Sequence, residues 1–317
     1  MIKLGIVMDP ISQIHLKKDT SLALLIEAQR RKWKIFYMEL HDIYLCNEVA
    51  CALTRTISIV EHQSPCYSFG PEHHINLNDL NVILMRKDPP VDSEFIYATH
   101  ILERAENTGT LIVNKPRSLR DCNEKIFASC FPHFIPDSLV TSNKEIIYNF
   151  YRLHGDIVLK PLDGKGGESI FRLTKNDPNI SVIIEIMTNY GHNYCMVQSF
   201  LPDIIKGGDK RVFIVDGQPV QYCLARIPPV GEIRGNLAVG GYGKVQSLSK
   251  IDWDIATSVS STFKEMGLLF VGLDIIGNKL TEINITSPTG VQEIESECSL
   301  SISGMIMDMI ENTINQR

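Results

Sequence analysis

The sequence predicts an α/β protein in which an N-terminal parallel sheet is followed by a region of smaller α+β units. The length of 317 residues suggests about two domains. Up to about residue 122, apolar strand-like runs alternate with helical segments, the pattern of a parallel sheet covered by helices on both faces. Beyond that residue, apolar runs come in pairs joined by short glycine-containing turns, which is typical of antiparallel hairpins.

The expected N-terminal elements follow one another in a regular order. Compact apolar runs predict strands over residues 3–8, 34–40, 81–90 and 110–116. Apolar residues at helical spacing predict helices over residues 19–32 and 93–109. Asp19 or Thr20 is a suitable N-cap for the first helix, and Gly109 closes the second. Residues 41–79 form a polar, cysteine-containing stretch to which no element is assigned.

The C-terminal elements mix helices with hairpins. Helices are expected over residues 123–131, 143–155, 178–191, 253–267 and 301–314. Single strands are expected over residues 138–141 and 194–202, and hairpins over residues 156–173, 209–227 and 268–285. Residues 228–243 belong to a segment rich in glycine and proline and without periodicity, which predicts a functional lid or a disordered loop.

Composition excludes several classes of protein. The chain is 44% hydrophobic and 21% charged, as in ordinary globular proteins, and its net charge of -6 disfavours nucleic acid and anionic membrane surfaces as partners. No run approaches the roughly 20 apolar residues of a membrane span. The eight cysteines have no zinc-type spacing, and the N-terminus resembles no export signal, so a reducing cytoplasm is expected.

The stretch "DIVLKPLDGKGGESIFRL" contains a glycine-rich loop between two expected strands. It lacks the residue order of a Walker loop and of a dinucleotide-binding turn. Glycines at 164, 166 and 167 let backbone N–H groups approach an anion, and Lys160 ends the preceding strand. The loop therefore predicts a flap over nucleotide phosphates, and the alternative is a solvent-exposed turn with an incidental lysine.

The stretch "GLDIIGNKLTEINITSP" contains a candidate metal site. Glu282 and Asn284 are two residues apart, so they share one face of a strand. Asp274 falls on that face only if the turn has one extra residue or the hairpin has a bulge. We predict this odd register, because two carboxylates and an amide oxygen then suit Mg²⁺. The alternative is an exposed acidic sheet face.

Arginines form the third group of candidates, and the histidines and cysteines form none. The four arginines lie at predicted strand ends or in the glycine-rich segment, where a bidentate fork can hold carboxylates or phosphates: Arg86, Arg211, Arg226 and Arg234. Each taken singly is better explained as a surface arginine, whereas the set together with the metal hairpin and the glycine loop favours clamps for the substrate. No G-x-S-x-G elbow is present, and no histidine lies in a motif with serine or cysteine, so a covalent nucleophile is not expected.

Several longer motifs resemble the prokaryotic glutathione synthetases, a family of the ATP-grasp superfamily. The resemblance runs from end to end and rests on "GIVMDPI", "VILMRKDPP", "EFIYATHILERAE", "LIVNKPRSLRDCNEK", "VLKPLDGKGG", "GDKRVFIVDG", "YCLARIP" and "GLDIIGNKLTEINITSPTG". It implies an N-terminal substrate-binding or oligomerisation domain over residues 1–122. It further implies an ATP-grasp lid subdomain over 123–200 and a C-terminal subdomain over 201–317, with a mobile loop at 228–243.

The resemblance also implies an activity. It is the ATP-dependent ligation of γ-L-glutamyl-L-cysteine with glycine through an acyl phosphate, the last step of glutathione biosynthesis, with Mg²⁺ or Mn²⁺ in a cytoplasmic homotetramer. An ATP-grasp carboxylate–amine ligase with another acid or amine, such as a D-alanine-type ligase, is the alternative. A nucleotide-binding regulatory protein without turnover is a reading from a different class.

The resemblance assigns roles to matching residues of this sequence. ATP would contact Lys125, Lys160, Gly164, Lys165, Gly166, Gly167, Gln198, Leu201 and Asp209. The metal ion would contact Asp274, Glu282 and Asn284. The dipeptide and the transferred phosphate would face Arg86, Arg211, Arg226, Arg234, Ser287 and Thr289, of which Arg211, Arg226 and Arg234 are the expected catalytic arginines. The chain departs from the family pattern at Lys165, where an uncharged residue is expected, and at Gln292, where an arginine is expected.

Overall fold

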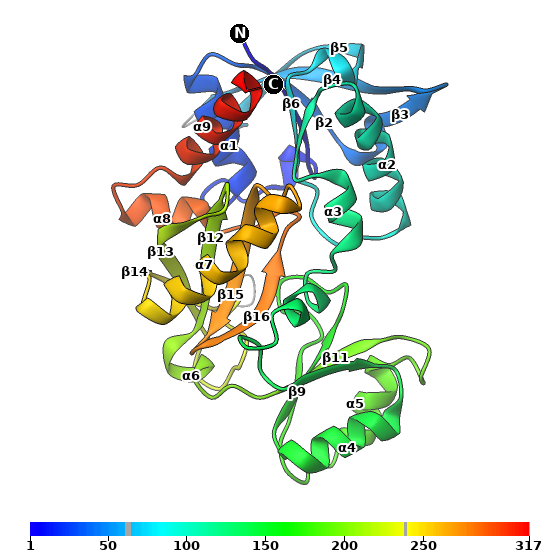
Figure 1. Cartoon of the computed structure of the whole chain (residues 1–317), viewed down its shortest axis with the longest axis vertical. Coiled ribbons are helices and arrows are strands. Elements are labelled where there is room, and N and C mark those ends of the chain that lie inside the picture. Colours follow the sequence, from blue (N-terminus) through cyan, green and yellow to red (C-terminus); the bar gives the residue numbers. More distant parts are fainter. Residues whose placement is uncertain (61–64, 238–239, 317) are drawn as a thin grey trace.

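The strands form three separate sheets in the computed structural model, which describes residues 1–60, 65–237 and 240–316 (Figure 1). The first sheet lies at the N-terminal end of the molecule. The second, with helices α4 and α5, lies at the opposite end, and the third lies between them. The third sheet therefore neighbours both of the other sheets.

The core of the first sheet is parallel, as the sequence predicts. Its central order is β2 (Lys34–Met38), β1 (Lys3–Val7), β6 (Val82–Met85) and β7 (Leu111–Val113), and all three pairings are parallel. Successive side chains of β1 belong to different clusters: Leu4 and Ile6 join a cluster that includes α1 (Thr20–Arg30), whereas Val7 joins a cluster that includes α2 (Ser93–Asn107). Both faces are therefore covered by helices. The Asp19 side chain accepts a hydrogen bond from the Leu22 N–H and caps α1.

Three strands extend this sheet through residues to which the sequence analysis assigned no element. They are β3 (Ile43–Cys46), β4 (Val49–Ile59) and β5 (Tyr67–Asn76), and all pair antiparallel, so the sheet is mixed. Strand β4 does begin with a short apolar run at 49–53, which the sequence analysis did not pick out, and its side chains alternate between buried and exposed only toward its end. Much of β5 is exposed and polar. Side chains of β3 and β4 join the buried clusters, and the exposed Arg55–Glu72 ion pair links β4 to β5 on the surface.

The second sheet is small and antiparallel. Its order is β10 (Phe171–Leu173), β9 (Ile157–Pro161), β11 (Cys195–Ser199) and β8 (Ser138–Thr141). Helices α4 (Lys144–His154) and α5 (Ile180–Met187) pack against it, and Gly155 ends α4 in the left-handed conformation, as expected. The helix expected over 123–131 is wrong in type and length. A short 3-10 helix at Ile126–Cys130 stands there, because the preceding residues run alongside β16.

The third sheet carries the two predicted C-terminal hairpins. Its order is β14 (Tyr242–Ser247), β13 (Gln218–Ile227), β12 (Asp209–Val215), β15 (Phe270–Ile276) and β16 (Lys279–Asn284). Helices α7 (Lys250–Glu265) and α9 (Ile302–Asn315) match expected helices, whereas α6 (Ile204–Gly207), α8 (Val291–Glu297) and the short α3 (Pro116–Asp121) were not expected. Strand β14 begins inside the expected lid at 228–243, and residues 238–239 of that segment lie outside the described residues.

The first and third sheets are joined more firmly to each other than to the second. Buried Asn114, after β7, donates from Nδ2 to the carbonyls of Phe270 and Ile285, and its Oδ1 accepts from the N–H groups of Leu269 and Phe270. The two large buried clusters contain side chains from both of these sheets, whereas the second sheet has a core of its own. The second sheet therefore packs around a core that is separate from those shared by the other two sheets. Among the described helices, none is long and apolar enough to cross a membrane.

Candidate active site

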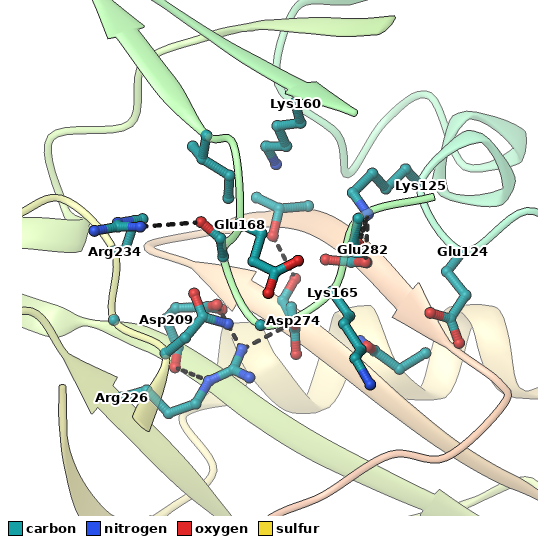
Figure 2. Close-up of a pocket in the computed structure, with 18 of the residues that line it drawn as sticks. Glu124, Lys125, Lys160, Lys165, Glu168, Asp209, Arg226, Arg234, Asp274 and Glu282 are labelled. Atoms are coloured by element: carbon teal, nitrogen blue, oxygen red, sulfur yellow. Dashed lines mark hydrogen bonds and ion pairs between the residues drawn. The ribbon is translucent and has the colours of Figure 1, made fainter. Parts of the chain in front are cut away.

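A cavity of about 500 Å³ lies between the second and third sheets. Figure 2 shows that its side chains come from facing elements, with Lys160 on one side and Asp209, Arg226 and Asp274 on the other. All predicted site residues except Arg86 line it: Lys125, Lys160, Gly164, Lys165, Gly166, Gly167, Gln198, Leu201, Asp209, Arg211, Arg226, Arg234, Asp274, Glu282, Asn284, Ser287 and Thr289. Residues up to 164 positions apart in the sequence thus meet in one cavity.

Two lysines mark one end of the cavity. Lys160 lies on β9, and burial lowers the pKa of its ammonium group, while the nearby carboxylate of Glu282 opposes this shift. The Nζ of Lys125 donates to the carbonyl of Gly164 at 2.8 Å and lies 3.3 Å from the Glu282 carboxylate. Lys125 therefore connects the glycine loop to β16.

The glycine loop meets the segment after β13 across the cavity. Gly167 has a φ of +84°, and a Cβ on this residue would lie 2.6 Å from Oδ1 of Asn236. Arg234 Nη1 donates to the carbonyl of Gly167 at 3.4 Å. Only glycine permits both this backbone conformation and this close approach. The two loops that the sequence analysis singled out thus touch each other.

The predicted register of the β15–β16 hairpin is confirmed. Asp274 pairs with Glu282 and Gly272 with Asn284, and the register shifts between Asp274 and Ile275. Ile275 pairs with Leu280, so Thr281 is the extra residue of the bulge. Without it, Asp274 would point to the opposite face of the sheet.

Asp274 is held by two arginines in the floor of the cavity. Its carboxylate accepts from Arg211 Nε at 2.6 Å and lies 2.9 Å from Arg226 Nη2. Burial by itself would raise the pKa of Asp274, but the two guanidinium groups outweigh burial and hold that pKa well below its ordinary value. Gly272 makes room for this arrangement, because a Cβ there would lie 2.9 Å from both Arg211 Cδ and Pro288 Cβ.

Asp209 lies on the same floor of the cavity, and the pKa of its carboxyl group shifts in the opposite direction. Burial raises the pKa of its carboxyl group to about 6, although Arg226 acts against this rise. One oxygen contacts Arg226, while Oδ1 is buried and has no hydrogen-bond partner among the described residues. Asp209 therefore presents an unsatisfied acceptor at the cavity.

The donor set near β16 fits a hard divalent cation. Glu282 supplies a carboxylate. Asn284 donates from Nδ2 to the Gly272 carbonyl at 3.2 Å, so its amide oxygen is the atom that could bind a cation. Mg²⁺ commonly takes few protein oxygens and completes its shell with phosphate and water. Within the described residues, no group of three or more His, Cys, Asp or Glu side chains suits a metal ion, and the present set has only two carboxylates beside the amide of Asn284.

The structure places Arg86 behind the cavity wall. Its Nε donates to Ser21 Oγ and its Nη2 to the carbonyl of Pro288, both at 3.1 Å, and burial lowers the pKa of its guanidinium group to about 10. It lies beneath the segment that carries Ser287 and Thr289. Gln292 stands where the resemblance leads us to expect an arginine, and its side chain donates to the Asp19 carbonyl at the start of α1.

Sequence reasoning missed three acidic residues that line the cavity, namely Asp88, Glu124 and Glu168. One oxygen of Glu124 accepts from the N–H groups of Ile285 and Thr286 and from the Thr286 hydroxyl, at 2.8 to 3.0 Å. Burial raises the pKa of Glu124, and the charge of Glu282 adds to this effect. Asp88 accepts from Ser287 Oγ at 2.6 Å. Its place after a parallel strand was the only available signal, because ligands bind near such strand ends.

Comparison with known proteins identifies the family of the chain. The family model described as "Prokaryotic glutathione synthetase, ATP-grasp domain" matches residues 124–299, and that of the N-terminal domain matches residues 2–120. The chain belongs to the prokaryotic glutathione synthetase family. Proteins named glutathione synthetase are similar over their full length. That of Salmonella typhi is 61% identical over 98% of both chains, and that of Escherichia coli strain K12 is 59% identical over 100% of both.

Solved structures agree on the ATP-grasp fold. D-cycloserine synthetase DcsG superposes with a TM-score of 0.70 at 10% identity and covers 98% of this chain and 100% of its own. The ATP-grasp ligase PsnB, solved with a minimal precursor, Mg and ADP, gives 0.62 at 16% identity and covers 98% of each chain. This member of the glutathione synthetase family is therefore an ATP-dependent ligase of mixed α/β ATP-grasp fold that acts on small molecules.

Proposed function

We propose that the chain joins γ-L-glutamyl-L-cysteine to glycine and converts ATP to ADP and phosphate in the same reaction. One observation carries this proposal: a glycine loop, two lysines, a carboxylate–amide pair and three arginines line a single cavity in a chain that is 59–61% identical to proteins named glutathione synthetase.

ATP occupies the side of the cavity next to the second sheet in this proposal. The ammonium groups of Lys125 and Lys160 and the backbone of residues 164–167 surround the phosphates. Gln198 and Leu201, at the end of β11, border the base. The free Oδ1 of Asp209 accepts from a ribose hydroxyl, which would satisfy the orphaned acceptor.

Asp274, Glu282 and Asn284 are the proposed residues that hold Mg²⁺ or Mn²⁺, with Asp274 shared by two arginines. When bound, such an ion neutralises charge on the β- and γ-phosphates. Glu282 and Asn284 offer the freer oxygens, so they are the principal ligands in this proposal.

The reaction gathers negative oxygens, and the arginines oppose that charge. The cysteinyl carboxylate attacks the γ-phosphorus and forms an acyl phosphate, and the amine of glycine then displaces phosphate. Arg211 and Arg226 lie in the cavity floor, while Arg234 lies in the segment that touches the glycine loop. Their role is electrostatic stabilisation and positioning, for which no covalent nucleophile on the protein is needed. Ser287, Thr289 and Arg86 contact or support the dipeptide end.

The division of the chain follows from these roles. Residues 1–122 form the substrate-binding or oligomerisation domain, residues 123–200 the lid subdomain, and residues 201–317 the subdomain with the metal hairpin. Residues 228–243 close over the site and exclude water, because an acyl phosphate hydrolyses once it is exposed. We place the protein in the cytoplasm as a homotetramer, by analogy with the family.

A substrate-omission assay tests the proposal. ADP release is measured with γ-glutamylcysteine and glycine together and with each omitted in turn, and the product is identified by mass. Release that requires both substrates and yields glutathione supports the proposal. Release that depends on another acid or amine assigns the chain to a different carboxylate–amine ligase, and ATP binding without any turnover assigns it to regulation.

A further inference from the structure

Lys165 does not point toward the same group as the other lysines of the site. Its Nζ donates to Oδ2 of Asp88 at 3.2 Å. Figure 2 shows Lys165 directed away from Lys160. Lys165 belongs to the glycine loop of the second sheet, whereas Asp88 follows β6 of the first sheet. The contact therefore joins the glycine loop of the second sheet to the segment that follows the first sheet.

Asp88 is fixed in place from two other directions. Its Oδ1 accepts from Ser287 Oγ at 2.6 Å, and its backbone N–H donates to Oδ2 of Asp9 at 3.0 Å. Asp9 in turn pairs with Lys87 at 2.8 Å. One carboxylate thus contacts both the glycine loop and the serine that is proposed to face the dipeptide.

We propose that the Lys165–Asp88 ion pair is a positioning bridge. It holds the glycine loop closed over the cavity and links the loop to the residues that are proposed to face the dipeptide. This inference rests on the proposed function and extends it. Closure over ATP and placement of the acid substrate become linked, because Asp88 also orients Ser287. In this proposal Lys165 contributes its backbone to the loop over ATP and its side chain to Asp88.

The strength of the bridge suits a contact that must open in each turnover. The two side chains are 49% and 43% exposed, so water and salt screen the pair. Pairs of this kind bias an equilibrium by about 1.5- to 5-fold. A bias of that size favours the closed loop without trapping product, and it decreases as ionic strength rises.

Two variants separate this role from a phosphate contact. Lys165→Met removes the ammonium group, and Asp88→Asn removes the charge while its Oδ1 can still accept from Ser287. If the bridge acts, both variants increase ATP hydrolysis uncoupled from peptide formation by the same factor, about 1.5- to 5-fold. The double variant is then no worse than either single variant. Lys175→Met, which changes an exposed lysine of the same subdomain outside the cavity, is the matched control and has no effect.

Three results would overturn the bridge. One is weaker ATP binding in Lys165→Met alone, which would identify a phosphate ligand. Another is a double variant whose defect equals the product of the two single defects. The third is an increase of uncoupled ATP hydrolysis in Asp88→Asn that Lys165→Met does not share.

Hydrogen exchange keeps this test separate from the test of the reaction. Amides of residues 164–168 in the unliganded protein exchange about 1.5- to 5-fold faster in both single variants if the bridge acts, whatever the substrates are. Unchanged exchange refutes the bridge even if the wild-type protein forms glutathione. Faster exchange together with no glutathione from the wild type refutes the proposed function and leaves the bridge standing.

Discussion

The close approach of Gly167 to Asn236 allows a sharp test of how the glycine loop closes. Replacing Gly167 by alanine places a Cβ 2.6 Å from Asn236 Oδ1 and 3.1 Å from its Cγ, at a φ of +84°. Gly166 provides a matched control. It also has a positive φ, of +64°, but a Cβ there would meet no atom within 4 Å.

Both variants strain the backbone of the closed loop, and Gly167→Ala adds a steric contact. An L-residue in the left-handed region costs about 1–2 kcal/mol, which applies to both variants. The contact with Asn236 adds roughly 0.5–1.5 kcal/mol in Gly167→Ala alone, because Oδ1 is the end of a partly exposed side chain that can rotate away from its preferred position. An open loop relaxes both strains, so the cost falls on closure. We expect kcat/KM for ATP to fall about 5- to 30-fold in Gly166→Ala, and by a further factor of about two to ten in Gly167→Ala.

Steady-state kinetics and thermal melting together provide the assay. Neither substitution should change Tm appreciably, because the loop lies outside the buried core of the second sheet. The double variant Gly167→Ala, Asn236→Ala removes both crowding atoms and should return to the level of Gly166→Ala. Equal losses in the two single variants, or no recovery in the double variant, would refute the role of the contact between the two loops.

Further predictions concern the carboxylates of the cavity. Glu282→Gln should raise the Mg²⁺ concentration needed for half-maximal turnover by at least about tenfold, while Tm changes little. Mutation of residues that only orient a metal ligand already weakens metal binding by about that factor. A Mg²⁺ titration like that of the wild type would remove Glu282 from the metal role. Asp274→Asn should destabilise the protein by roughly 3–5 kcal/mol in urea unfolding, because it leaves two buried arginines without their shared charge. The pKa of Asp274 is depressed in the folded state, so its contribution to the free energy of unfolding is present above the unfolded pKa of 3.8 and is lost as pH falls below it. Asp274→Asn should therefore lose less stability in acid than the wild type. Parallel curves of stability against pH for the two proteins would contradict this. The pKa of Asp209 is raised to about 6, so its stabilising contribution is complete below 3.8 and lost as pH rises through 6. Asp209→Asn should therefore weaken ATP binding and remove the inflection near pH 6 from the dependence of stability on pH; an inflection that persists would belong to another group.

The hairpin that carries Asp274 and Glu282 shows how far local reasoning reaches. The two-residue period places Glu282 and Asn284 on one face, whatever the rest of the chain does. The position of Asp274 depended on a bulge, which the sequence analysis predicted only because a three-ligand site required it. The pairing of Asp274 with Glu282 confirms that register.

Arg86 and Asp88 show where local reasoning stops. Both follow the same strand, and the sequence favoured the arginine as the residue that faces a ligand. Burial instead places Arg86 against Ser21 and Pro288, while Asp88 faces the cavity. Which of two neighbouring side chains enters a cavity depends on how the following segment turns, and this turn is set by packing against residues some 200 positions away.

The sequence by itself determined the strands and helices whose apolar residues repeat with a clear period, because burial of one face imprints that period on the chain. It also determined the family, through long motifs that combine glycine turns with charged residues. Only the tertiary structure decided the antiparallel strands at 43–76, in which one short apolar run is surrounded by polar and exposed residues, and the meeting of Lys165 with Asp88. Contacts of this kind join residues from separate sheets, and no local pattern encodes the distance between them.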